Sequence, residues 1–167
     1  GNSLSGTLST NIGNMQSLNM FMIERNNFGG TLPTELGLLQ QLSFLTLDDN
    51  SFTGSIPTEL GALTNIEALT MYNNALTGMI PSEFSRFSNI KSLSLYGNKL
   101  SGPIPSELGL LTSLERLILH FNDFTGTMPA EICALRKGAL FQLSANCAGD
   151  TNPPVTCEQP ECCTVCF

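Results

Sequence analysis

Apolar and polar residues alternate in short runs that recur along the chain at a constant interval. In the clearest run, Leu45 and Leu47 alternate with Thr46 and Asp48, and Asn50 follows. Alternation with a period of two predicts a short β-strand with one buried face. The run returns at an unchanging spacing, and its asparagine column is Asn2, Asn26, Asn50, Asn74, Asn98, Asn122 and Asn146. A fixed period of this length predicts a solenoid of stacked coils that share one elongated core.

The complete repeat adds a glycine, a proline and a glutamate to the leucines. The copy that begins at Leu42 reads L-x-x-L-x-L-x-x-N-x-F-x-G-x-I-P-x-E-L-G-x-L. This pattern resembles the plant-type leucine-rich repeat, whose members include plant receptor-kinase ectodomains and polygalacturonase-inhibiting proteins. The resemblance implies an α/β solenoid: a right-handed superhelix of about seven coils, with short parallel strands on the concave face and short 3₁₀ or helical pieces on the convex face. It also implies a second short strand in each coil, around the apolar column Leu4, Phe28, Phe52, Leu76, Leu100 and Phe124.

Two polar columns have direct structural interpretations. An asparagine amide has two donors and one acceptor, so a stacked column can satisfy backbone groups inside the turns. This structural asparagine ladder is expected to comprise Asn26, Asn50, Asn74, Asn98, Asn122 and Asn146. Proline at a first helical position, with glutamate two residues later, predicts the start of each short helical piece. The prolines of this column are Pro33, Pro57, Pro81, Pro105 and Pro129.

The repeat is regular through residue 132, which divides the chain into two parts. Residues 1–132 are expected to form the solenoid, and residues 133–167 a degenerate last coil and a cysteine-rich C-terminal cap. In that coil, Phe141, Leu143 and Asn146 are expected to keep the strand register. The first residues fall inside a turn, so either the chain is a fragment of a longer protein or its first coil is open.

All six cysteines lie in the second part: Cys133, Cys147, Cys157, Cys162, Cys163 and Cys166. An even number in a short terminal segment predicts three disulfides and an oxidising, extracellular compartment. A zinc site is the alternative, but no pair of cysteines recurs at finger spacing and no histidine is nearby. We expect Cys133 and Cys147 both to pair with cysteines that follow Cys157. The last thirty or so residues, with Leu-x-Ala-x-Cys147 and Cys162-Cys163-Thr-x-Cys166, are similar to the ends of leucine-rich repeat proteins predicted to be secreted from diatoms and related algae.

The formal net charge is −7, and part of it is structural. One column at the helical starts supplies five of the fourteen acidic residues: Glu35, Glu59, Glu83, Glu107 and Glu131. The seven lysines and arginines are scattered, which argues against a nucleic-acid partner, because such binding requires clustered positive charge. No apolar run approaches the length of a membrane span.

The residues expected to face outwards from the concave strands include both tyrosines and the single histidine of the chain. Tyr72, Tyr96 and His120 follow one another in one column, with Phe121 beside the histidine. Such a ridge is suited to a sugar ring or a peptide, because these side chains combine apolar area with a polar tip. The alternative is that rings on neighbouring strands stack only to stabilise the sheet. The predicted ligand-binding residues are Tyr72, Tyr96, His120, Phe121, Phe44 and Arg116.

Catalytic, metal and cofactor sites are not expected. His120 has no acid and nucleophile around it, and the pair Asp48–Asp49, although able to bind calcium, is more simply a solvated turn edge. A hydroxyl column precedes the turn glycines and is expected to cap local backbone, with ice binding or O-linked sugar as minor alternatives. Its members are Ser5, Thr53, Thr77, Ser101 and Thr125, with Gly29 in the second coil.

The hypothesis from the sequence is a secreted, non-enzymatic binding module. Its concave face would recognise a protein, a peptide or a cell-wall polysaccharide. The alternative is an extracellular structural or adhesive protein that assembles with itself into a filament or matrix through its first coil.

Overall fold

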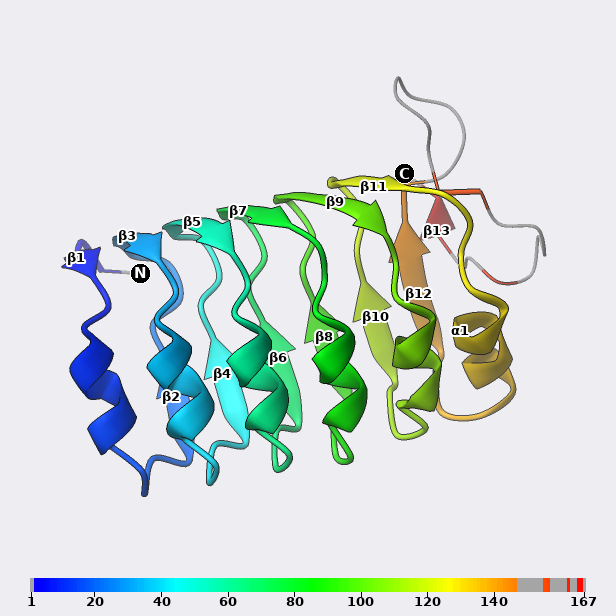
Figure 1. Cartoon of the computed structure of the whole chain (residues 1–167). Helices are drawn as coiled ribbons and strands as arrows, with labels where there is room; N and C mark the ends of the chain where they lie inside the picture. The colour runs from blue at the N-terminus through cyan, green and yellow to red at the C-terminus, as the bar shows by residue number, and fades with distance from the viewer. Residues whose placement is uncertain (1, 147–154, 157–161, 163–164, 167) are drawn as a thin grey trace.

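The computed structural model describes residues 2–146, 155–156, 162 and 165–166, and every structural statement below concerns these residues. The coils stack side by side and place two parallel sheets on different sides of one core (Figure 1). The concave sheet has the order β13-β12-β10-β8-β6-β4-β2. Its strands are β2 (Met20–Met22), β4 (Phe44–Thr46), β6 (Ala68–Thr70), β8 (Ser92–Ser94), β10 (Arg116–Ile118), β12 (Gln142–Ala145) and β13 (Val165–Cys166).

The second sheet confirms the extra strand that the plant-type resemblance implies. Its strands follow the order of the sequence, and each begins shortly after an asparagine of the repeat. They are β1 (Ser5–Thr7), β3 (Asn27–Thr31), β5 (Ser51–Ser55), β7 (Ala75–Gly78), β9 (Lys99–Pro103) and β11 (Asp123–Thr125). We call this sheet the outer sheet. The α/β solenoid with short strands and 3₁₀ turns is therefore as expected.

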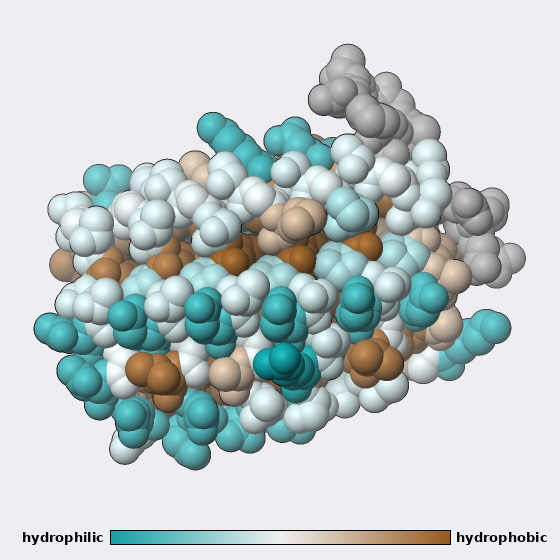
Figure 2. Space-filling view, viewed as in Figure 1, coloured by the Kyte–Doolittle hydropathy of each residue, from teal (hydrophilic) through white to brown (hydrophobic). Residues whose placement is uncertain are grey.

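Short helical pieces cover the remaining side of the coils and lie in front of the concave sheet in Figure 1. They are η1 (Thr10–Asn14), η2 (Thr34–Leu38), η3 (Thr58–Ala62), η4 (Ser82–Arg86), η5 (Ser106–Leu110), α1 (Ala130–Ala134) and η6 (Leu135–Lys137). From η2 to η5 and in α1, the proline of the repeat is the N-cap residue and not the first helical residue, one position earlier than predicted. Its extended backbone leads into the helical turn, and the glutamate lies in the first turn, where the helix dipole favours a carboxylate. Figure 2 shows this side of the molecule as a mainly polar surface with separate apolar side chains.

The interior is one continuous apolar core, to which each coil contributes leucines from both the strand and the helical piece. The asparagines join the coils through the backbone. The Nδ2 of Asn74 donates to the carbonyl oxygens of Leu47, at 3.0 Å, and Met71, at 3.2 Å, and its Oδ1 accepts the Phe52 N–H at 3.0 Å. Asn50, Asn98 and Asn122 make the same set of bonds in their own coils.

The last coil departs from the predicted register. Ser92 pairs with Arg116, which lies one repeat period later, but Arg116 pairs with Gln142, which lies two positions beyond the next period. The two additional residues lie between Pro129 and Gln142, where α1 continues into η6 in place of a single 3₁₀ turn. A shift of two residues keeps the alternation of inward and outward side chains along the strand. It places each residue of the last coil opposite a different position of the coil before it.

Two expectations for this coil are therefore wrong. Phe141, expected to keep the strand register, is 58% exposed, whereas its neighbour Leu140 is buried. Asn146 does not continue the asparagine ladder: its Oδ1 accepts from the N–H of Asn122, not from the N–H of Phe124 that the earlier coils would predict. Because the strand pairing of the last coil is shifted by two residues, Asn146 aligns with His120 and not with Asn122.

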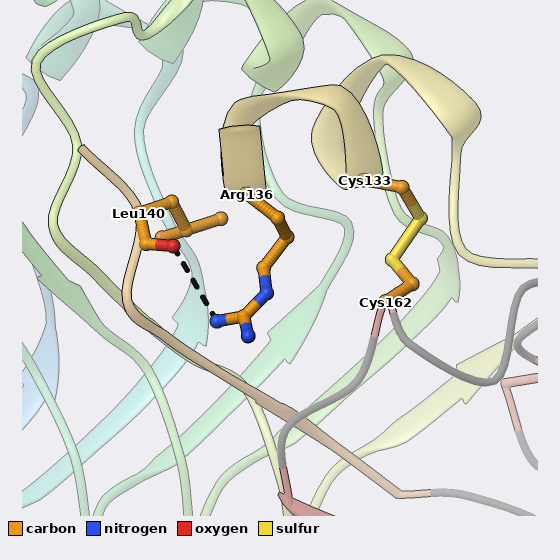
Figure 3. Close-up of a disulfide and its surroundings, with 4 residues drawn as sticks. All are labelled: Cys133, Arg136, Leu140 and Cys162. Carbon is orange, nitrogen blue, oxygen red and sulfur yellow. Dashed lines mark hydrogen bonds between the residues drawn. A yellow bond between two sulfur atoms is a disulfide. The ribbon is translucent and has the colours of Figure 1, made fainter. Parts of the chain in front are cut away.

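A disulfide between Cys133 and Cys162 joins α1 to the C-terminal tail, with Cα atoms 5.0 Å apart (Figure 3). Both cysteines are buried. Beside this bridge, the guanidinium of Arg136 donates to the carbonyl oxygen of Leu140 at 3.4 Å (Figure 3). The same nitrogen also donates to the carbonyl oxygen of Phe141 at 2.8 Å. Cys147, Cys157 and Cys163 lie outside the described residues, as does the predicted pairing of Cys147.

Candidate ligand-binding face

The structure brings together four of the predicted ligand-binding residues. Tyr72, Tyr96 and His120 each lie two residues after a concave strand, and their rings form a continuous stack that we call the aromatic ladder. The Tyr72 and Tyr96 centroids are 4.5 Å apart with an interplanar angle of 8°, and the Tyr96 and His120 centroids are 4.8 Å apart with an angle of 9°. The interstrand spacing of a sheet, about 4.8 Å, sets this ring separation.

The stacking determines which parts of the rings a ligand can meet. The facing surfaces of Tyr72, Tyr96 and His120 are occupied by one another, so ring edges and tyrosine hydroxyls remain for a ligand. Phe121 lies edge-on to His120, at a centroid distance of 4.8 Å and an angle of 76°, and is 56% exposed. Phe121 also has a backbone φ of 55°, a conformation that bulky residues rarely adopt. The exposed ring of Phe121 adds apolar area at the His120 end of the aromatic ladder.

At the other end, the column continues into a buried carboxylate. Asp48 is only 4% exposed, so the expectation of a solvated turn edge is wrong for this residue. Its Oδ2 accepts the Thr70 hydroxyl at 2.6 Å, and its Oδ1 accepts the Tyr72 N–H at 3.0 Å. Burial raises the pKa of Asp48 to about 6; the charges of Asp49 and Glu24 add to this, and the two hydrogen bonds oppose it. Asp48 thus fixes the backbone from which the first ring of the aromatic ladder projects.

The ionisable groups of the aromatic ladder itself are neutral near pH 7. Burial, and next the charge of Asp48, raises the pKa of Tyr72. Burial, and next the charge of Asp49, raises the pKa of Tyr96. Both hydroxyls therefore stay protonated and can donate hydrogen bonds. Burial lowers the pKa of His120, which favours the neutral imidazole, and the Nδ1 lies 2.9 Å from the Ser144 hydroxyl.

The remaining two predicted residues lie on the same sheet but in another row. Phe44 and Arg116 both occupy the first position of their strands, whereas the aromatic ladder lies four residues further along each coil. Phe44 is half-buried and pairs with Met20 and Ala68 on the neighbouring strands. Arg116 is exposed, and its Nε lies 3.4 Å from the Ser92 hydroxyl.

Sequence reasoning missed two features of this face. Met20 and Met22 are each 50% exposed on β2, next to Phe44. The alternating pattern placed them outwards, and their apolar character at an outward position was the available signal. The second is the anchoring by Asp48, which depends on Thr70 and Tyr72 of the next coil.

The described part of the chain contains no group of three or more His, Cys, Asp or Glu side chains that could hold a metal ion. Within the same part, no helix is long and apolar enough to cross a membrane.

Comparison with known proteins identifies the repeat. The leucine-rich repeat family model matches residues 41–63, 65–87, 89–111 and 113–135. The plant peptide hormone receptor RGFR1, solved in complex with RGF2, is 34% identical with a TM-score of 0.83; the match covers 87% of this chain and 23% of the receptor chain. The Arabidopsis receptor kinase HAESA ectodomain, solved with an IDA peptide hormone ligand, is 32% identical with a TM-score of 0.76, over 84% of this chain and 24% of that one.

A plant ice-binding protein is 28% identical with a TM-score of 0.73, over 78% of this chain and 43% of that one. No curated protein matches the chain. The chain spans about a quarter of the length of the two receptor chains. The four matched repeats cover more than half of the sequence, and together with the receptor structures they show that the chain belongs to the leucine-rich repeat family, in its plant type.

Proposed function

We propose that this chain is a secreted, non-enzymatic binding module that holds an extracellular peptide segment against its aromatic ladder. The observation that carries the proposal is the aromatic ladder itself, with the exposed Phe121 at its end. RGFR1 and HAESA, which share its fold at 34% and 32% identity, were both solved with peptide ligands. Aromatic residues also dominate the binding energy of many interfaces.

Ring geometry favours a peptide over a polysaccharide. A sugar ring packs its apolar face against an open aromatic face, but stacking occupies the facing surfaces of Tyr72, Tyr96 and His120 and leaves Phe121 as the one exposed ring beside them in the described part of the chain. A peptide can instead accept hydrogen bonds from the tyrosine hydroxyls and pack side chains against the ring edges.

The test uses the intact chain and the double variant Tyr72→Ala/Tyr96→Ala. Each chain is panned against a displayed random dodecapeptide library and probed with a panel of cell-wall oligosaccharides. We expect the natural chain to enrich peptides that the double variant binds at least about thirtyfold more weakly, since an interface hot spot contributes about 2 kcal/mol or more. Met79→Ala, at an exposed position that follows β7 of the outer sheet, is the matched control and should bind like the natural chain. Equal enrichment on the double variant, or retention of oligosaccharides only, would contradict the proposal.

A second candidate function rests on the outer sheet. Hydroxyl side chains lie on one or both sides of each turn glycine, at Ser5, Thr7, Thr31, Thr53, Ser55, Thr77, Ser101, Thr125 and Thr127. Parallel pairing spaces them by about 4.8 Å across strands and about 6.6 Å along them, a grid that can order water. Because the chain is also similar to a plant ice-binding protein, ice is the surface this grid would bind. Inhibition of ice recrystallisation that Thr53→Lys/Thr77→Lys abolishes would support this function, and no inhibition by the natural chain would exclude it.

Self-assembly into a filament stays a prediction. Light scattering over a range of protein concentrations measures it, and a monomer at all concentrations would contradict it.

A further inference from the structure

One set of apolar side chains on the concave face follows a diagonal across the sheet. At the β2 end they occupy the first and third strand positions, where Met20 and Met22 are exposed and Phe44 is half-buried. From β6 onwards the aromatic side chains lie two residues after the strand, where the aromatic ladder begins at Tyr72, while the half-buried Ile118 keeps an apolar side chain at the third position of β10. They end at Phe121, four coils after β2. The diagonal crosses the sheet through the half-buried Ala68 and Thr70 of β6.

Charge is unbalanced at one corner of the same face. Beside the start of the aromatic ladder, Glu24, Asp48 and Asp49 face a single cation, Arg25, whose Nε lies 3.7 Å from Asp49 Oδ2. On the same face, ahead of β6 and β8, Lys91 pairs with Glu67 at 2.8 Å. Among the described residues, the three acids beside the start of the aromatic ladder outnumber their cation, so an occupant meets excess negative charge at that corner.

Glu24 and Asp49 are the partly exposed acids of this corner, and Glu24 has the fewer partners among the described residues. Asp48 is buried under its contacts with Thr70 and Tyr72, and Asp49 accepts Asn73 Nδ2 at 2.7 Å in addition to its pair with Arg25. Glu24 is partly exposed, and its carboxylate accepts a hydrogen bond from the Thr46 hydroxyl at 2.9 Å, which leaves acceptor positions on both oxygens.

We propose that the occupant is an extended peptide segment with one cationic residue, placed against Glu24, and one large apolar residue, placed against Phe121. This inference rests on the proposed function of the aromatic ladder and defines the ligand that it selects. A cation at Glu24 offsets the excess charge, and the apolar residue covers the exposed ring of Phe121. Between these ends, the tyrosine hydroxyls meet the polar backbone that an extended chain presents at every residue.

The dimensions of the sheet set the spacing of the two residues. From Glu24 to His120 the column crosses four interstrand spacings, roughly 19 Å at about 4.8 Å each. An extended peptide covers this length in about six residues. Because side chains of an extended chain alternate between faces, both anchors can point at the sheet only when an even number of positions separates them. The selected ligand thus carries Lys or Arg about six positions from a large apolar residue.

The experiment pans the random dodecapeptide library in parallel against the intact natural chain, Glu24→Lys, and the Tyr72→Ala/Tyr96→Ala variant. Glu59→Lys makes the same charge change at an exposed position on the helical side and is the matched control. Circular dichroism and thermal melts establish that each variant is folded, and Glu24→Gln provides a near-isosteric replacement should Glu24→Lys not fold. Enriched peptides are then synthesised, and their affinities are measured by fluorescence anisotropy.

We expect peptides enriched on the natural chain to share the cation and the apolar residue at this even spacing. They should bind Glu24→Lys at least about tenfold more weakly and bind Glu59→Lys unchanged. Enriched peptides without the cation, or with equal affinity for Glu24→Lys, would overturn the inference and leave the proposed function standing. Peptides that bind the tyrosine variant as well as the natural chain would overturn the proposed function, and the inference with it.

Discussion

A buried carboxylate at residue 48 makes the stability of the solenoid depend on pH. In the folded chain the pKa of Asp48 is about 6, whereas an unperturbed aspartate titrates near about 3.9. The folded state therefore binds this proton more tightly than the unfolded state, so folding is favoured at low pH. The stability from this group is fully present below about pH 4 and is lost as the pH rises through about 6. His120 titrates with the opposite sign, because burial lowers its pKa.

The variant Asp48→Asn separates the contribution of Asp48 to the pH dependence of stability from that of His120. An asparagine oxygen can still accept the Tyr72 N–H but has no charge to bury. We expect the variant to gain roughly 1–2 kcal/mol relative to the natural chain between pH 4 and pH 7.5. Urea unfolding of both proteins at the two pH values measures this gain. A difference between the proteins that does not change with pH would contradict the assigned pKa.

The burial of Asp48 shows why the sequence predicts the aromatic ladder better than its anchor. Tyr72, Tyr96 and His120 share one column, and the repeat period alone makes them neighbours. The same alternation places Asp48 outwards, as a solvated residue. Asp48 is buried because Thr70 and Tyr72 of the next coil contact it. The repeat period predicts which positions align, but it does not predict how closely side chains of different size pack.

At the scale of elements, the sequence predicts those columns in which every coil needs the same type of residue. Up to β11, both strands of each coil lie where the repeat implies them, and the helical turns begin one residue after the proline. The last coil was not predictable in this way. Asn146 keeps the interval of the repeat, yet α1 and η6 add two residues to the coil, so the strand pairing shifts by the same two positions. The length of a helical connection is set by how it packs, and the hydrophobic pattern does not record it.

The shifted register predicts unequal roles for two asparagines of the same sequence column. Asn98 is buried, and its amide satisfies the carbonyls of Met71 and Leu95 and the N–H of Leu76. Asn98→Ala leaves these groups unpaired and should cost roughly 2–3 kcal/mol.

The side-chain oxygen of Asn146 accepts one hydrogen bond, at 3.3 Å, and Asn146→Ala should cost less than about 1 kcal/mol. Urea titration of the two variants compares them directly. Similar losses would mean that Asn146 occupies a position of the asparagine ladder after all.

The whole molecule is a linear stack, so each coil is stabilised mainly by its neighbours. The disulfide between Cys133 and Cys162 acts at one end of this stack, where it joins the buried side of α1 to the tail. Closing a loop of 29 residues contributes roughly 3–4 kcal/mol when the unfolded chain is the reference. In a stack with nearest-neighbour coupling, removal of the disulfide should therefore lower the stability mainly of the coils next to the bridge.

We therefore expect Cys133→Ser/Cys162→Ser to lose protection locally. Hydrogen exchange followed by mass spectrometry should show faster exchange in α1 and β12, whereas β4 and β6 retain the protection of the natural chain. The central coils thus act as an internal control within the same protein. Uniform acceleration from β2 to β12 would mean that the stack unfolds as one cooperative unit. Unchanged exchange in β12 would mean that packing around Leu140 and Leu143, without the bridge, holds the last coil.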